Sequence, residues 1–277
     1  MTFDKLFAKY MKSPQFKKLK TRSKQLYLYG ARGLSDYLGD KQVDKIRRSD
    51  LLRFQQEASD RPAYANVALR VASIVFSYGL DMEYVDHNPA ARIKKLKVGS
   101  HTKWMLDEVK AIIALHDRKI STAVALAWYT GQRESDVLNM RWADFDGEYL
   151  AVKQEKTNLD MKIKVHPDLA LYLNRIRGIE PDGSYIVSGP QKMGGPAFRN
   201  MFKRRTDKLG IKKVFHGIRK GVASSLAENG SPISEIAALM GHKSIRMAAY
   251  YAEQANSKVL TESAVGNLSR VISPAYD

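Results

Sequence analysis

The hydrophobic pattern of this chain changes its period in one short region, residues 149–165, and that change limits the folds it can adopt. Residues 149–154 and 161–165 are short extended runs, and the polar stretch 155–160 between them suits a hairpin turn. On both sides of this region, apolar residues recur at helical spacing. The pattern therefore predicts a mainly α fold that carries one small antiparallel β-sheet.

Helices are predicted on both sides of the hairpin. Near the N-terminus, Leu26 and Leu34 belong to an apolar set at roughly helical spacing. Ser49 is expected to cap a short helix, and Gly79 is expected to end a longer one. The predicted helices cover residues 24–38, 49–57, 62–78, 106–115, 121–130, 133–141, 196–208, 218–228 and 233–240.

A basic segment, residues 88–100, divides the chain. Pro89 disfavours helix at the residue before it, the Lys and Arg side chains repel one another, and Gly99 with Ser100 loosens the end. The segment predicts a helical domain over 1–90, a linker over 91–103, a larger domain over 104–253 and a tail over 254–277. The alternative is a solvated strip on the surface of one domain.

The charge of the chain points to a polyanionic partner. The sequence has 46 Lys and Arg against 29 Asp and Glu, a net charge of +17 and a pI of about 9.8. Such an excess favours nucleic acid. Residues 1–100 alone hold 20 basic and 10 acidic side chains, so the helical domain carries much of this charge. An anionic membrane is the rival, but the sequence shows no polybasic amphipathic helix and no lipid anchor.

The absence of cysteine excludes several kinds of structural and catalytic site. With no Cys in the sequence, disulfides, thiolate metal sites and cysteine nucleophiles are excluded, and a reducing cytoplasm fits. The most apolar stretch noted, 121–129, is too short to span a bilayer. No membrane association, metal or cofactor is expected.

Three short motifs hold residues suited to one kind of chemistry. Arg133 stands in TGQRESDVL, His216 and Arg219 stand in HGIR, and His242 and Tyr251 stand in GHKSIRMAAYY. Metal-free cleavage of a phosphodiester needs a nucleophile, charge clamps for the phosphate, a proton donor for the leaving alkoxide and a group that handles the proton of the nucleophile. Arginine suits the clamp because its planar fork binds phosphate through two hydrogen bonds.

The motifs resemble those of the tyrosine recombinases, the phage-integrase family. Residues 130–138, followed by Arg141 and Trp142, resemble the first arginine box of that family, and residues 216–219 resemble its His-x-x-Arg element. Residues 239–242 with Tyr251, nine positions after His242, resemble its final box. The resemblance covers nearly the whole chain. It implies a helical core-DNA-binding domain over 1–90, followed by a tyrosine-recombinase catalytic domain over 104–253.

The resemblance implies a role for each residue that matches a motif. Tyr251 would be the nucleophile that forms a 3′-phosphotyrosine and releases a 5′-hydroxyl, with Tyr250 as its competitor. Arg133 and Arg219 would clamp the phosphate. His216 would assist proton transfer involving Tyr251, and His242 would hydrogen-bond a non-bridging oxygen.

Two further residues are implied, and one position departs from the family. Lys156 matches the lysine of the family's hairpin, which protonates the leaving oxygen, although other lysines of the two strands compete for this role. Asp136 matches an acidic residue that supports the site. Gly217 stands where the family often has an aspartate, which puts the capping of the following helix in doubt.

The resemblance implies a site-specific DNA recombinase, an integrase of a phage or other mobile element in the bacterial cytoplasm or nucleoid. Two subunits would bind each double-stranded core site and four would form a synapse, with strand exchange through a Holliday junction and without metal or ATP. The free protein would be a monomer or weak oligomer. DNA-bending or directionality factors are candidate further partners. The tail, 254–277, would dock on a neighbouring protomer or fold back on its own core.

Two alternatives stay open at this point. A type IB topoisomerase-like enzyme uses a very similar set of residues on a single duplex. A DNA-binding protein of the same fold could have lost catalysis, although all six key residues are present.

Overall fold

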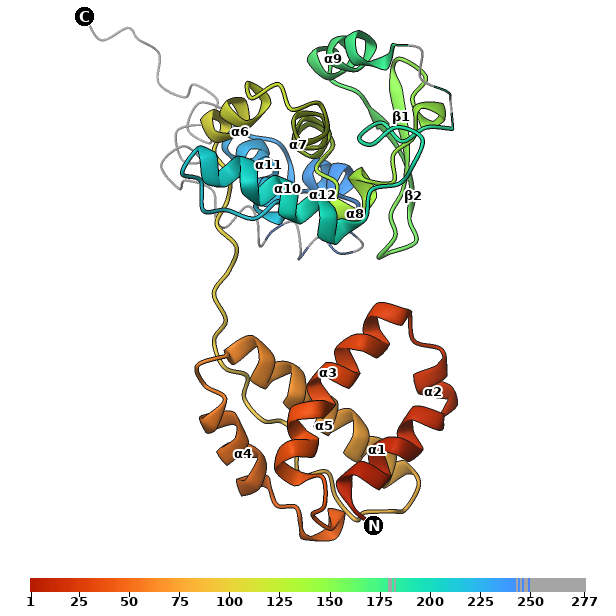
Figure 1. Cartoon of the computed structure of the whole chain (residues 1–277), viewed down its shortest axis with the longest axis vertical. Coiled ribbons are helices and arrows are strands. Elements are labelled where there is room, and N and C mark those ends of the chain that lie inside the picture. The colour runs from red at the N-terminus through yellow and green to blue at the C-terminus, as the bar shows by residue number, and fades with distance from the viewer. Residues whose placement is uncertain (179–180, 182, 243, 245, 247–248, 250–277) are drawn as a thin grey trace, which may run out of the picture. The chain divides into compact units, whose positions relative to one another are not determined.

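The computed structural model describes residues 1–178, 181, 183–242, 244, 246 and 249. The chain divides into two compact units, Met1–Ser100 (unit 1) and His101–Asp277 (unit 2). Each unit has its own buried core of apolar side chains. The mainly helical fold expected from the sequence is confirmed, and Figure 1 labels its elements.

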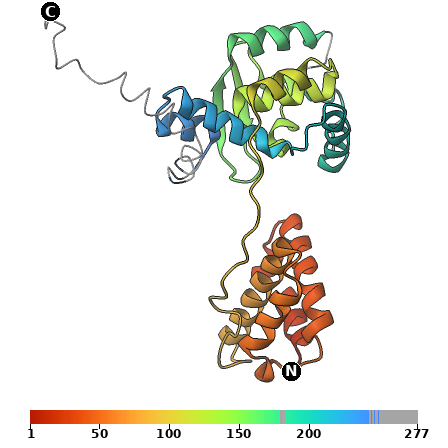
Figure 2. The same ribbon diagram turned by 90° about the vertical axis from the view of Figure 1, so that its left-hand side faces the viewer.

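Unit 1 is a small helical bundle. Figure 2 shows its helices packed side by side, and α5 packs against α1, α3 and α4. Its α-helices are α1 (Phe3–Lys12), α2 (Pro14–Lys17), α3 (Thr21–Leu38), α4 (Arg48–Glu57) and α5 (Pro62–Asp81), and a 3₁₀ helix spans Val43–Lys45. The core contains Phe3, Leu6, Leu34, Leu51 and Phe76, all fully buried.

Three details of unit 1 differ from the sequence-based expectation. Helix α4 begins at Arg48, and the Asp50 carboxylate, rather than Ser49, caps it by accepting from the backbone N–H of Arg47 at 2.8 Å. Gly79 does not end α5, because it lies inside the helix, where a Cβ would meet Leu6 at 3.1 Å. The absence of a Cβ at Gly79 thus leaves room for α5 to pack closely on α1. Leu26 is 42% exposed and contributes little to the core.

Helix α5 has the length and composition of a membrane-spanning segment, with a mean hydropathy of 1.2 over an 18-residue window. It is the single such helix in the described part of the chain, and the sequence analysis overlooked it in favour of residues 121–129. In the structure, 44% of this window is buried inside the protein. Since Val75 and Phe76 lie at the centre of the unit 1 core, α5 acts here as a core helix.

The segment after α5 stays part of unit 1 up to Ser100, further along the sequence than expected. The side chain of Asn66 donates to the carbonyl of Leu96 and accepts from its N–H, both at 2.9 Å. Gln55 donates to the carbonyl of Lys94 at 2.8 Å. These bonds hold residues that the sequence assigned to the linker along the helices of unit 1.

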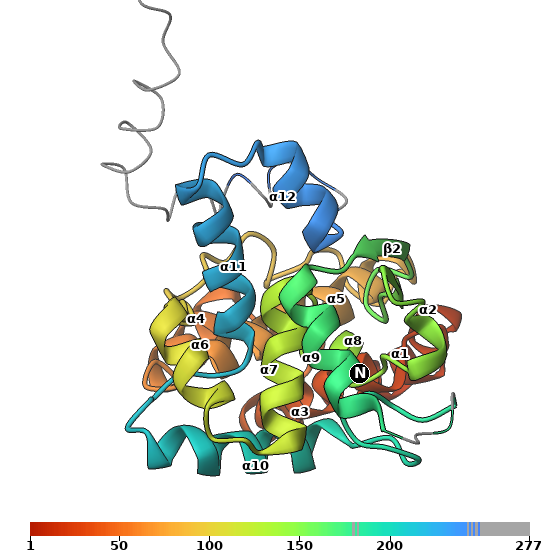
Figure 3. The same cartoon turned by 90° about the horizontal axis from the view of Figure 1, so that it is seen from above.

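Unit 2 surrounds one central helix. Helix α7 packs against α6, α8, α9, α10 and α11, and Figure 3 shows it between α9 and α11. The helices of unit 2 in the described residues are α6 (Leu106–Ile113), α7 (Arg118–Thr130), α8 (Glu134–Val137), α9 (Pro167–Arg177), α10 (Gly195–Lys208), α11 (His216–Glu228) and α12 (Ile233–Met240), with a 3₁₀ helix at Trp142–Asp144. Helix α9 was not predicted.

The predicted hairpin is confirmed. Strands β1 (Tyr149–Lys153) and β2 (Asp160–Lys164) pair antiparallel, with Leu150 opposite Ile163 and Lys153 opposite Asp160. Leu150 and Ile163 point into the core of unit 2, and their exposed neighbours alternate with them along each strand. The turn between the strands projects from one side of the unit (Figure 1).

The helix predicted over residues 133–141 is wrong in its length, because α8 ends at Val137. Beyond it the chain becomes extended and forms long-range pairs. The carbonyl of Met140 accepts from the N–H of Ile186 at 2.9 Å, and Arg141 pairs with Tyr185 in an isolated antiparallel bridge. A backbone engaged in these pairs cannot also continue the helical ladder.

Candidate active site

Arg219 lies on α11 and joins three helices. Its side chain is buried, and its guanidinium donates to the carbonyl of Gly131 and, at 2.6 Å, to that of Met240. Gly131 caps the C-terminus of α7 in a left-handed conformation, and Met240 is the last residue of α12. Carbonyls at helix C-termini carry partial negative charge, so both stabilise the cation. Arg219 is therefore held in a fixed orientation.

Arg133 reaches the same region from the turn that follows α7. Its Nη1 donates to Oε1 of Gln154 at 2.9 Å and lies 3.7 Å from Oδ2 of Asp136. Its side chain is 16% exposed. The Asp136 side chain is fully buried, and its Oδ1 accepts from the N–H of Glu155 at 2.9 Å. Asp136 thus links α8, which carries Arg133 at its start, to the hairpin turn.

His216 stands at the first position of α11 beside these arginines. Burial by protein atoms is the largest cause that lowers the pKa of His216, and electrostatic repulsion from His101, Arg219, Arg133 and Lys156 acts in the same direction, so that the pKa falls to about 4. The outer part of the residue stays exposed to solvent. The imidazole is therefore neutral at pH 7 and able to accept a proton.

His242 follows the end of α12 and is half-buried. Desolvation, followed by the positive charges of Arg219 and Arg133, lowers the pKa of His242 to about 4. Because both arginines act on both imidazoles, Arg133 and Arg219 form one cationic pair with two neutral imidazoles beside it. Such a group suits an anion with several oxygens.

Lys156 lies in the β1–β2 turn and is exposed. Its charge helps to lower the pKa of His216, so its ammonium lies within electrostatic reach of that imidazole. Tyr250 and Tyr251, with the tail 254–277, lie outside the described residues. Among the described residues, no cluster of three or more His, Asp or Glu side chains has the geometry of a metal site.

The phage integrase family model matches residues 103–258, more than half of the chain. The chain belongs to the phage integrase family. It is a tyrosine-type site-specific DNA recombinase, as the resemblance of its motifs implied.

Relatives across the family resemble this recombinase over much of its length. A tyrosine recombinase of Thermosipho africanus is 24% identical over 84% of this chain and 88% of its own. The integrase of Salmonella phage P22 is 26% identical over 74% of this chain and 58% of its own. A lambda integrase fragment, solved as a dimer bound to a COC′ core site, superposes with a TM-score of 0.81, 21% identity and coverage of 99% of this chain and 100% of that one.

The structure explains why this recombinase has glycine at 217, where the family often has an aspartate. A Cβ at Gly217 would collide with the carbonyl oxygen of Thr102 and would lie 2.9 Å from the ring of Trp104. The N–H of Trp104 donates to the Gly217 carbonyl at 3.2 Å, so the backbone entering unit 2 lies directly on α11. Close approach of the backbone, rather than capping, determines the residue at this position.

Gln154 is a site residue that the sequence analysis did not identify. It is fully buried at the end of β1, and its Nε2 donates to Oε1 of Gln132 at 2.7 Å and to the carbonyl of Met240 at 3.0 Å. Its Oε1 accepts from Arg133 and, at 2.6 Å, from the hydroxyl of Thr157 in the turn that carries Lys156. One amide therefore connects Arg133, the hairpin and the end of α12.

Replacing Gln154 by alanine should lower the rate of DNA strand cleavage about tenfold or more, because Arg133 and the hairpin lose their shared partner. It should also reduce the free energy of unfolding by about 1–3 kcal/mol, since buried polar groups are left unpaired. Single-turnover cleavage and urea unfolding measure the two effects. Gln191→Ala, at an exposed loop position of the same unit, is the matched control, and equal behaviour of the two variants would contradict the role of Gln154.

Proposed function

We propose that this recombinase cleaves a DNA strand by attack of Tyr251 on a phosphodiester held between Arg133 and Arg219. The observation that carries this proposal is the convergence of two oriented arginines and two neutral histidines on one side of unit 2. Family membership supplies the site-specific recombination, the resemblance of the motifs implies the residue roles, and the geometry of the arginines and histidines supports them.

The proposed step is a balanced transfer of one phosphoryl group. The phenol oxygen of Tyr251 bonds to phosphorus, its proton passes to neutral His216, and the bond from phosphorus to the 5′-oxygen breaks. Lys156 gives a proton to that leaving oxygen. The arginines and His242 stabilise the charge that develops on the non-bridging oxygens. Because the phosphotyrosine conserves the energy of the broken bond, the reverse attack by a 5′-hydroxyl rejoins DNA without ATP.

The electrostatics of the site suit this transfer of a proton from Tyr251 to His216. The positive charges that lower the pKa of His216 also lower the cost of bringing in a phosphate anion. A phosphate bound among them would oppose their effect and raise the pKa of both imidazoles. His216 would then take up the phenol proton more readily in the complex than before DNA binds.

We infer the following assembly on DNA. Unit 1, with its excess of basic residues, acts as the core-DNA-binding domain, and unit 2 acts as the catalytic domain. Two protomers occupy each core site and four form the synapse, with the tail of each docked on a neighbour. Lambda integrase, which shares the fold, was solved as a tetramer bound to a Holliday junction.

We further infer that the protein is a mobile-element integrase that acts in the bacterial cytoplasm or nucleoid. The free protein is a monomer or weak oligomer, and DNA-bending or directionality factors assist it.

The experiment that tests this function traps the covalent complex. A duplex selected for binding from a randomised library is nicked so that cleavage releases a short fragment and prevents rejoining. We expect a protein–DNA adduct joined through the 3′-phosphate, and peptide mapping should place the bond on Tyr251. Absence of an adduct on every selected duplex would contradict the proposal. Relaxation of supercoiled plasmid with no joining of two sites would instead indicate the topoisomerase-like reaction.

A further inference from the structure

The chain enters unit 2 across a glycine-lined surface of α11. Gly217 and Gly221 lie one helical turn apart, and a Cβ on either would collide with backbone carbonyls of residues 102–104. Trp104, 1% exposed, fixes this segment, since its indole N–H donates to the carbonyl of Val214 at 3.0 Å. Residues 102–104 are therefore held against the helix that begins with His216.

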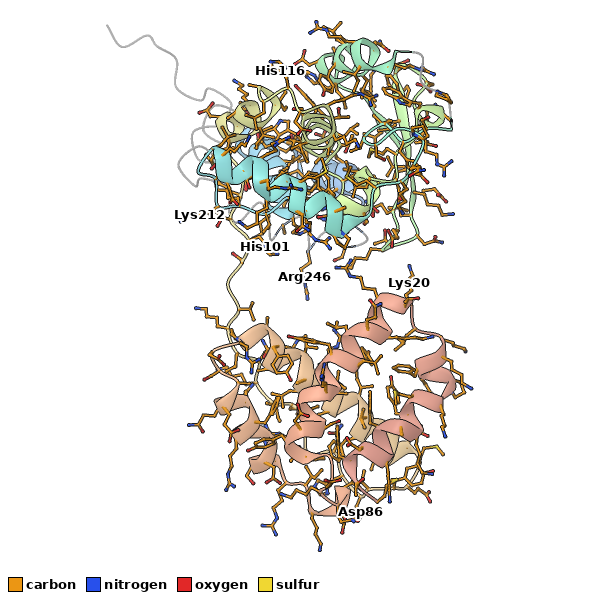
Figure 4. All side chains as sticks on the ribbon, in the orientation of Figure 1. Lys20, Asp86, His101, His116, Lys212 and Arg246 are labelled. Atoms are coloured by element: carbon orange, nitrogen blue, oxygen red, sulfur yellow. The ribbon has the colours of Figure 1, made fainter. Side chains whose placement is uncertain are left out.

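This anchoring places His101 beside His216. The two rings lie edge to face, with centroids 5.7 Å apart and an interplanar angle of 71°. Figure 4 shows His101 where the chain enters unit 2, at the opposite edge of that unit from His116. His101 belongs to the segment that connects the units and matches none of the three motifs.

We propose that His101 is a positioning residue of the recombinase, which holds His216 through its ring and its charge. The inference rests on the proposed role of His216 as proton acceptor. The ring of His101 limits the rotation of the His216 side chain by packing against its face or edge. Electrostatic repulsion between the two imidazoles when both carry a proton disfavours protonation of His216 and thereby preserves the neutral base.

The charged environment of His216 comes from every side of the site. After burial, His101 is the largest cause that lowers the pKa of His216, ahead of Arg219 on the same helix, Arg133 before α8 and Lys156 in the hairpin. His101 differs from the other three because it directly follows Ser100, where unit 1 ends. A change in the path of the chain before Thr102 would move His101 while Trp104 stays fixed. The conformation of the linker would therefore alter the environment of His216 through the contact between the two rings.

The test compares His101→Asn and His101→Phe with the matched control His116→Asn. His116 is an exposed residue of the same unit with φ 52°, a conformation that asparagine tolerates. The first measurement is an NMR titration of the His216 imidazole in the protein alone. Loss of a neighbouring positive charge makes protonated His216 less unfavourable, so in both His101 variants its pKa should rise, by about half a pH unit.

The second measurement is single-turnover cleavage of the nicked duplex as a function of pH. The acidic limb of the rate profile should move to higher pH in both His101 variants, because His216 is lost as a base at a higher pH. At a fixed pH on that limb, half a unit corresponds to a rate roughly threefold lower. At pH 8, His101→Phe should keep the wild-type rate because its ring still packs, whereas His101→Asn should lose rate. His116→Asn should match the wild type throughout.

The outcomes separate this inference from the proposed function. If the wild-type protein forms no covalent adduct, the proposed function fails, while the NMR titration still reports on the contact. If the adduct forms but His101→Asn keeps the wild-type titration and pH profile, the role of His101 is overturned. A His101→Phe protein that loses as much rate at pH 8 as His101→Asn would contradict the packing part of the proposal.

Discussion

Replacing Tyr251 by phenylalanine should abolish covalent cleavage of DNA, lowering the rate by at least about a thousandfold, because the variant has no oxygen to attack phosphorus. The phenyl ring keeps the shape of the side chain, and the cationic residues that hold the phosphate are unchanged. DNA affinity should therefore stay close to that of the wild type. Adduct formation on the nicked duplex and an electrophoretic binding titration measure the two quantities.

Tyr250 provides the matched control, since it is the adjacent tyrosine and loses the same single oxygen on replacement. Tyr250→Phe should keep most of the cleavage rate if the nine-residue interval from His242 to Tyr251 identifies the nucleophile. The reverse pattern, with loss of cleavage in Tyr250→Phe and activity in Tyr251→Phe, would move the nucleophile by one position. Cleavage by both variants would rule out a tyrosine nucleophile in this motif.

The helices and strands that could be predicted well are those whose limits are determined by neighbouring residues in the sequence. The hairpin could be found because a polar stretch separates two short extended runs, and α12 matched its predicted limits. The limits of α8 could not be predicted from the local sequence, since the chain after Val137 pairs with residues about 45 positions later in the sequence. A local pattern contains no information about such pairs, and tertiary contacts override helix propensity there.

The residues of the candidate site also fall into two groups: those that a local motif identifies and those that only the folded chain brings together. Arg133, His216, Arg219 and His242 could be selected because each lies in a motif with a family spacing. Gln154 belongs to no motif, and its importance depends on four partners that come together only in the folded chain. Gly217 looked like a departure from the family until the backbone of residues 102–104 was placed beside it.

Arg219 is expected to show a large effect of a different kind, because it serves both the fold and the chemistry. Its guanidinium bonds the carbonyls of Gly131 and Met240, which belong to the ends of two other helices. Burying a cation costs several kcal/mol unless partial or full negative charges surround it. The proposed phosphate would add a full negative charge to these two carbonyl dipoles, so binding of the phosphate and order in the site should reinforce each other.

Arg219→Ala should therefore reduce strand cleavage by about a thousandfold and lower the free energy of unfolding by about 1–3 kcal/mol, because the buried carbonyl of Gly131 loses the guanidinium as donor and that of Met240 keeps Gln154 but loses Arg219. Arg219→Lys retains the charge but lacks the planar fork, so it should recover part of the DNA affinity and little of the cleavage rate. Arg175→Ala, at an exposed arginine in the last turn of α9, controls for the loss of one positive charge. Single-turnover cleavage and urea unfolding of the three variants test this dual role. Cleavage by Arg219→Ala at the rate of Arg175→Ala would show that the phosphate is held elsewhere.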